Sequence, residues 1–180
     1  MAMPLDLVLI RHGESVGNAA IRDAKAGLPM PPADDQQSTR LWLLNATGER
    51  QAEATGAWMR ENGLDRFDRY YCSPYVRTTQ TAALLRLPDA SWWLEPLLRE
   101  RDRGYEYLAN RELAGVFPHS ARGRKHDIFL WRPTAGESIA DVDLRLRGSS
   151  PRSHANWTAN GSSASPTRTR WTHCASGSRR

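Results

Sequence analysis

The sequence is short of three features, and each shortage narrows the class of protein. It contains only two cysteines, Cys72 and Cys174, among 180 residues, too few for the disulfide framework of a small secreted domain. No apolar run approaches the roughly 20 residues that a membrane-spanning helix needs. The first residues also lack the pattern of a secretory signal. We therefore expect a cytoplasmic protein with no membrane partner.

The formal net charge is +5, but most of the chain carries no excess of positive charge. Residues 148–180 hold five of the 25 basic residues, all arginines, and no acidic residue, which leaves 20 basic and 20 acidic residues elsewhere. These arginines are scattered, and Trp157 and Trp171 are the only aromatic residues there that can stack on bases. The pattern argues against nucleic acid as a partner.

The same segment contains no Leu, Ile, Val, Met or Phe, so we predict that it adds no strand to a core. We divide the chain into a domain at 1–147 and an atypical Ser/Arg-rich tail at 148–180, which we expect to be disordered or out of frame. Three interpretations of the tail stay open. The first is a natural disordered tail, and the second is a tail that binds nucleic acid. The third, which we favour, is an altered end that replaces a native strand.

Strand and helix patterns alternate along the first 147 residues. Apolar or aromatic runs predict strands at 4–10, 68–72 and 91–96. Helices are predicted at 46–62, 74–86 and 138–147, whereas Asn18 to Leu43 suggests a frayed helix followed by an irregular loop. Residues 111–131 are a mixture of helix and loop. Strands that alternate with helices favour an α/β sandwich.

Particular residues are expected to begin or end these helices. Asn45 can cap the second helix, and Gly63 can stop it. Pro74 suits a first helical position because it lacks the N–H that is unpaired there in any case. Ser138 and Asp141 have the spacing of a capping box.

The triplet Arg11, His12 and Gly13 directly follows the first aliphatic run. This places an arginine and a histidine at the carboxyl edge of a sheet, where open α/β folds bind their ligands. A strand-end arginine beside a packed histidine would be the ordinary structural explanation. The rest of the sequence favours a functional one.

Five motifs together resemble the histidine phosphatase superfamily, also called phosphoglycerate-mutase-like. They are RHGES with Asn18 three residues later, LNATGERQA at 44–52, SPYVRTTQTA at 73–82, LRERDRG at 98–104 and GES at 136–138. The resemblance covers roughly the first 147 residues. It implies an α/β three-layer sandwich with a mostly parallel sheet flanked by helices.

The resemblance also implies roles for five residues. His12 matches the nucleophile, Arg11 and Arg77 match the phosphate-binding arginines, Asn18 matches a phosphate or substrate contact, and Glu100 matches the proton donor. Guanidinium groups suit phosphate because their planar fork binds two oxygens. A nucleophilic imidazole must be neutral, so we expect its second nitrogen to donate to a fixed acceptor such as a backbone carbonyl.

Some of these roles have alternatives. Asn18 equally suits a turn or a helix cap, and Asp102 and Glu14 are alternative acids. The superfamily has a second histidine late in the chain, at the end of an apolar strand. Neither His154 nor His173 follows such a strand. We therefore predict weak or absent turnover.

The sequence as a whole predicts a phosphatase that hydrolyses a small phosphate monoester through a phosphohistidine intermediate. The alternatives are a non-catalytic phosphate- or phosphopeptide-binding module and a mutase-type phosphotransferase. No motif for a metal or a cofactor is present, so we expect neither. The loop between Asn18 and Leu43 is our candidate for substrate selection, and the oligomeric state is left undetermined.

Overall fold

The computed structural model describes residues 6–28, 39–102, 104, 123, 126–148 and 170–175. These residues form two compact units, which are described separately. The first unit holds the described residues up to Arg99 together with 170–175, and the second holds those between Glu100 and Gly148. The segment 111–131 was predicted to be a mixture of helix and loop, and its residues 111–122, 124 and 125 lie outside the described part of the chain.

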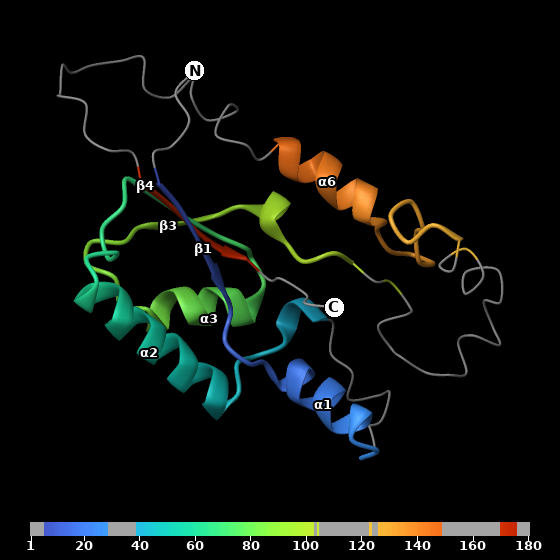
Figure 1. Cartoon of the computed structure of the whole chain (residues 1–180), viewed down its shortest axis with the longest axis horizontal. Helices are drawn as coiled ribbons and strands as arrows, with labels where there is room; N and C mark the ends of the chain where they lie inside the picture. Colours follow the sequence, from blue (N-terminus) through green and yellow to red (C-terminus); the bar gives the residue numbers. More distant parts are fainter. Residues whose placement is uncertain are drawn as a thin grey trace. The chain divides into compact units, whose positions relative to one another are not determined.

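The first unit contains one parallel sheet of four strands (Figure 1). The strands are β1 (Asp6–Arg11), β2 (Arg69–Cys72), β3 (Trp92–Leu94) and β4 (Arg170–Ala175). Their order across the sheet is β1-β4-β2-β3, and every neighbouring pair is parallel. The three strands predicted from the sequence are therefore present, and a fourth lies between the first two.

Helices follow the strands. The first unit has the α-helices α1 (Val16–Lys25), α2 (Ala46–Glu61) and α3 (Val76–Leu84), and the short 3-10 helices η2 (Thr39–Leu41) and η3 (Pro96–Leu98). The second unit contains α6 (Ile139–Gly148). The α/β class with a parallel sheet and flanking helices is confirmed. α1 is a regular helix of ten residues, where the sequence suggested a frayed helix.

α2 packs closely against the end of α3 through its small residues. Asn45 caps this helix by accepting the N–H of Gly48 at 2.8 Å, and Ala52, Gly56 and Met59 are buried along one face, as predicted. A Cβ on Gly56 would collide with the Leu85 carbonyl at the end of α3. The two helices therefore lie close together beneath the strands (Figure 1).

A compact apolar core joins these helices to the sheet. It is built from Ile10, Met59, Tyr70, Leu85 and Leu87. Because β1, β2, α2 and the end of α3 all contribute, the core fixes the position of the strand end that carries Arg11 and His12.

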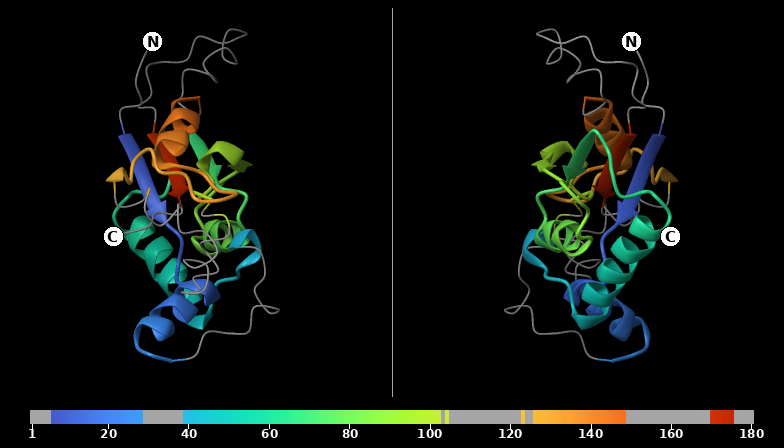
Figure 2. Two further views of the ribbon diagram at one scale, coloured as in Figure 1. Left: turned by 90° about the vertical axis from the view of Figure 1, so that its right-hand side faces the viewer. Right: turned by 90° about the vertical axis from the view of Figure 1, so that its left-hand side faces the viewer.

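Strand β4 corrects the prediction that no strand forms after Arg147. Its register pairs Leu9 and Tyr71 with His173, and Arg11 with Ala175. Figure 2 shows β1 and β4 side by side from two opposite directions. A strand between two others is held by backbone hydrogen bonds on both sides, and these do not require Leu, Ile or Val side chains. The division into a domain and a tail otherwise stays a prediction.

Helix α3 begins later than Pro74, the predicted first position. Its first residue is Val76, and Tyr75 precedes it as the N-cap. The Ser73 hydroxyl accepts the N–H of Tyr75 at 3.4 Å, a local hydrogen bond that holds the chain in a bend before the helix starts. Arg77 is consequently the second residue of α3.

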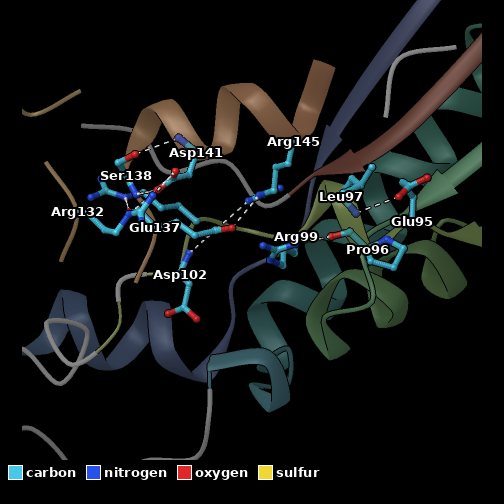
Figure 3. Close-up of polar contacts among 11 residues, drawn as sticks. Glu95, Pro96, Leu97, Arg99, Asp102, Arg132, Glu137, Ser138, Asp141 and Arg145 are labelled. Atoms are coloured by element: carbon cyan, nitrogen blue, oxygen red, sulfur yellow. Dashed lines mark hydrogen bonds and ion pairs between the residues drawn. The ribbon is translucent and has the colours of Figure 1, made fainter. Parts of the chain in front are cut away.

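The second unit is organised around Glu137 and the start of α6 (Figure 3). Ser138 and Asp141 form the predicted capping box, with bonds of 2.8 and 3.0 Å. The Arg132 guanidinium, together with the Ser138 groups, lowers the pKa of Asp141 to about 2. Glu137 accepts from Arg145 at 3.2 Å and from the backbone of Asp102 at 3.1 Å. The GES motif therefore has a structural role in this unit.

The position of β4 can be tested by substituting proline for Thr172, which pairs with Val8 and Tyr70. Proline has no N–H for the ladder and is excluded from central strands. We expect Thr172→Pro to lower the free energy of unfolding by more than ~2 kcal/mol, because buried backbone groups lose their partners. The measurement is urea unfolding followed by tryptophan fluorescence. Thr172→Val is the control, and equal stability of the two variants would contradict a central strand.

Candidate functional site

Three basic side chains, those of Arg11, His12 and Arg77, come together at the ends of two neighbouring chain segments. One segment follows β1, and the other is the helix that follows β2. Arg11 ends β1, His12 follows it, and Arg77 enters from the first turn of α3, which itself follows β2. His12 is 7% exposed and Arg77 is 1% exposed, whereas Arg11 is exposed. The expected meeting of these residues at the carboxyl edge of the sheet is therefore present.

The hydrogen bonds of His12 define its tautomer. Its Nδ1 lies 2.6 Å from the Gly13 carbonyl oxygen, and its Nε2 lies 3.1 Å from Arg77 Nε. A carbonyl can only accept and a guanidinium can only donate. Nδ1 therefore carries the proton, and Nε2 presents a lone pair toward the guanidinium of Arg77.

Burial keeps His12 uncharged. Loss of contact with water lowers the pKa of His12 to about 4, although the hydrogen bond to the Gly13 backbone opposes this change, and the charges of Arg77 and Arg11 lower the pKa further. An imidazole with such a pKa is neutral near pH 7. Its Nε2 lone pair is therefore available as a base or a nucleophile.

A chain of hydrogen bonds fixes the Gly13 N–H, which belongs to the peptide group between His12 and Gly13. The Gly13 N–H donates to Thr81 Oγ1 at 3.2 Å, and the Thr81 hydroxyl donates to the Arg77 carbonyl at 2.7 Å. The sequence analysis did not single out Thr81. Its spacing of four residues from Arg77 places both on one face of α3, and this spacing was the signal available.

Gly13 is required by a close approach between the segment after β1 and the first turn of α2. A Cβ on Gly13 would collide with the Gly48 carbonyl, and a Cβ on Gly48 would collide with the Glu14 carbonyl. Backbone meets backbone here, so side chains cannot be accommodated by rotation. This contact explains why glycines occur in both the RHG and the NATG motifs.

A cavity of about 440 Å³ opens beside His12. Its lining includes Arg11, His12, Gly13, Glu14 and Asn18. Its remaining lining includes Ile21, Arg22 and Lys25 from α1 and Gln51 from α2. The sequence analysis did not identify these last four residues as site residues, although three of them follow Asn18 at helical spacing.

Asn18 combines the two roles that the sequence left open. It forms a capping box with Ser15, whose backbone N–H donates to Asn18 Oδ1 at 3.1 Å and whose hydroxyl accepts the Asn18 N–H at 3.2 Å. Asn18 also lines the cavity. With its oxygen engaged at the cap, its amide nitrogen is the group that can donate to a ligand.

Glu14 also reaches the cavity but is occupied by neighbours. Its carboxylate is ion-paired with Arg22 and accepts from Asn45 Nδ2 at 2.8 Å. The other acids suggested by the sequence, Glu100 and Asp102, belong to the second unit. Within the described residues, no three His, Cys, Asp or Glu side chains gather as metal ligands.

The register of β4 places His173 away from the edge that carries His12. The backbone of His173 is level with Leu9, three residues before His12. Strand residues rise about 3.3 Å each, so the offset is about 10 Å along the strand. Ala175 is the residue of β4 that lies level with Arg11.

Comparison with known proteins establishes the family. Residues 7–152 match the Histidine phosphatase superfamily (branch 1), so the chain belongs to this superfamily, as the motifs predicted. It is 30% identical over 145 residues to the 6-phosphofructo-2-kinase/fructose-2,6-bisphosphatase of Caenorhabditis elegans, across 80% of this chain and 28% of that protein. It is 29% identical over 152 residues to the 2,3-bisphosphoglycerate-dependent phosphoglycerate mutase of Rhizobium etli, across 78% of this chain and 63% of that protein.

The chain thus spans less than two thirds of the length of either relative.

Solved structures confirm the phosphoglycerate-mutase-like α/β fold. The alpha-ribazole phosphatase from Shigella flexneri superposes with a TM-score of 0.68 at 22% identity, covering 94% of this chain and 73% of that one. The mycobacterial glucosyl-3-phosphoglycerate phosphatase with inorganic phosphate gives 0.62 at 22% identity, covering 93% and 72%. None of the described helices is both long and apolar enough to cross a bilayer.

The low pKa of His12 predicts how stability depends on pH. Between its ordinary pKa of 6.5 and about 4, the unfolded chain binds a proton at this residue that the folded chain does not. Lowering the pH through this window therefore reduces the free energy of unfolding, by up to ~3 kcal/mol from this residue. We expect His12→Asn, whose amide can still donate to the Gly13 carbonyl, to lose this part of the pH dependence.

The measurement is chemical unfolding of both proteins at several pH values from 4 to 7. The free energy of unfolding of the variant minus that of the wild type should increase as the pH falls, because only the wild type loses stability through His12. The contributions of the other histidines cancel in this difference. A difference independent of pH would contradict a buried, neutral His12.

Proposed function

We propose that the chain is a phosphomonoesterase in which His12 accepts the phosphoryl group. The observation that carries this proposal is the tautomer of His12, because a buried imidazole with a protonated Nδ1 has its lone pair on Nε2, the nitrogen that attacks once Arg77 donates to a phosphate instead. Membership of the histidine phosphatase superfamily supports the same chemistry. The relatives include a mutase and a bisphosphatase, which supports phosphoryl transfer as the class of reaction.

The proposed reaction has two steps. His12 Nε2 attacks phosphorus in line, the new P–N bond replaces the P–O bond to the leaving group, and Glu100 protonates the departing oxygen. Water then attacks the phosphohistidine with Glu100 as the base, which releases inorganic phosphate and restores the neutral imidazole. No redox partner is needed in either step.

Arg77 must change partners during this reaction. Its Nε donates to the same lone pair that attacks phosphorus, and its Nη1 donates to the Thr39 carbonyl at 2.6 Å. A phosphate oxygen beside His12 would take over the Nε–H donation, which frees the lone pair. Arg11 is exposed at the cavity and would bind the phosphate from the opposite side, so charge accumulates on the transferred group between two guanidiniums.

Hydrolysis of phosphate monoesters is favoured over transfer to a second substrate. A mutase has to hold its phosphoenzyme away from water, and the cavity beside His12 is lined in part by exposed residues of α1 and α2. We also propose that turnover is slow. No histidine of β4 lies level with Arg11, and a missing donor to the transferred phosphoryl group costs about 100- to 1,000-fold in rate.

Trapping of the phosphoenzyme tests the nucleophile. We expect the purified chain, mixed with a radiolabelled phosphate donor and quenched in alkali, to carry an acid-labile phosphohistidine at His12. His12→Asn should show no label, whereas the exposed His126→Asn should label like the wild type. Steady-state release of phosphate should be slow relative to labelling, because water attacks without the second donor.

The outcomes separate the remaining alternatives. Tight phosphate binding without any covalent label would favour the non-catalytic module. Fast turnover that His12→Asn abolishes would keep the phosphatase but contradict the impairment. Label in His12→Asn would remove His12 from the proposed role.

A further inference from the structure

The cavity extends well beyond the space needed for one phosphate group. Four of its lining residues, Asn18, Ile21, Arg22 and Lys25, all belong to α1. Their spacing of three, four and seven residues places them along one face of the helix. With a rise of 1.5 Å per residue, Asn18 and Lys25 are about 10 Å apart along the axis. The cavity therefore runs from His12 along the length of α1.

The chemistry of the lining changes along this face. Asn18 lies at the His12 end, Ile21 supplies an apolar contact in the middle, and Arg22 and Lys25 supply two positive charges at the far end. The two cations also lie in the last turn of the helix, where the negative end of the helix dipole stabilises them. A group bound at the far end would therefore meet positive charge about 10 Å from the phosphate-binding end.

The two cations have different surroundings. Arg22 is ion-paired with Glu14 and with Asp23, the latter at 3.2 Å. Lys25 is exposed, and among the ion pairs of the described residues it takes part in none. Since Glu14 is the only acidic residue in the lining and is shared with Arg22, the positive charge of Lys25 is not balanced within the cavity.

We propose that Lys25, assisted by Arg22, binds a second anionic group of the substrate, a carboxylate or a phosphate on the end of the molecule remote from the bond that is broken. Ile21 would contact the carbon skeleton between the two anionic ends. This inference rests on the proposed function and deepens it, because it assigns the substrate class. The preferred substrate is an elongated phosphate monoester with two negative ends.

Electrostatics sets the size of the expected discrimination. An exposed ion pair contributes about 0.2 to 1 kcal/mol, and the pair formed with Lys25 in a half-enclosed cavity falls near the top of this range. An ester with a second anionic group should therefore bind about 3- to 5-fold more tightly than an ester of the same shape with a neutral group in its place. The advantage should shrink with added salt, because the Debye length is about 10 Å at 0.1 M.

The test uses two matched esters, a phenyl phosphate with a para carboxylate and the same compound with a para carboxamide, each also prepared with longer methylene spacers. The two members of a pair share their shape and differ in one charge. We measure kcat and KM for hydrolysis, and we measure affinity by calorimetry with His12→Asn so that binding is observed without turnover. The carboxylate should have the lower KM and Kd, with kcat nearly unchanged between the two esters.

Three variants locate the charge that is responsible. Lys25→Met keeps the length of the side chain and should abolish the preference for the carboxylate, and Lys25→Arg should retain it. Arg50→Met removes the same charge from α2 at an exposed residue outside the cavity lining, and it should leave the preference unchanged. This control separates a local contact from the general field of the protein.

Failure of this inference is distinguishable from failure of the phosphatase. Hydrolysis of the carboxamide ester that requires His12, combined with equal Kd values for the two esters, would overturn the subsite and keep the phosphatase. A preference that survives in Lys25→Met would overturn the assignment of Lys25. Absence of binding by both esters would overturn the proposed function and the inference together.

Discussion

The hydrogen bond between His12 and the carbonyl of its own neighbour, Gly13, is the interaction on which the site depends. It places the proton of the buried imidazole on Nδ1, so that the lone pair is on Nε2, where it accepts the Arg77 Nε–H bond. The bond needs the Gly13 carbonyl in one orientation. The N–H of the same peptide group, that of Glu14, donates to Gln51 Oε1 at 2.9 Å, and the preceding N–H, that of Gly13, donates to Thr81 Oγ1 at 3.2 Å. The helices α2 and α3 therefore cooperate to hold one tautomer.

The two arginines at the site solve different problems. Arg77 is buried, and its charge would be costly there without the imidazole and carbonyl groups that accept its N–H bonds. Arg11 is exposed and keeps its hydration until a ligand arrives. One guanidinium is thus fixed in advance and the other is adaptable, an arrangement that limits the reorganisation required when an anion enters.

Much of this could be read from the sequence, because the signals were local. The aliphatic run before Arg11 identified β1, and the Asn45 and Ser138 caps identified the starts of their helices. The bend before α3 was missed because it depends on one hydrogen bond, from the Tyr75 N–H to the Ser73 hydroxyl. Strand β4 was missed because its formation depends on backbone pairing with two distant strands, which the side chains of residues 170–175 do not signal.

The residues of the site to which the motifs assign a role were predicted from the sequence, and the others were not. Arg11, His12 and Asn18 belong to motifs and line the cavity, and Arg77, also in a motif, donates to His12 Nε2. Thr81 and Lys25 lie on helix faces whose direction is set only when α3 and α1 are packed. Their spacings from Arg77 and Asn18 were visible in the sequence, but the partner that each face would meet was not.

The place of β4 in the sheet has a consequence for synthesis of the protein. β1 and β2 are translated early, yet the strand that separates them is near the end of the chain. While the ribosome makes the intervening residues, both edges remain without their native neighbour and are open to wrong pairing. A nascent chain of this kind depends on delayed closure of its sheet, and chaperones that shield exposed edges would act in that interval.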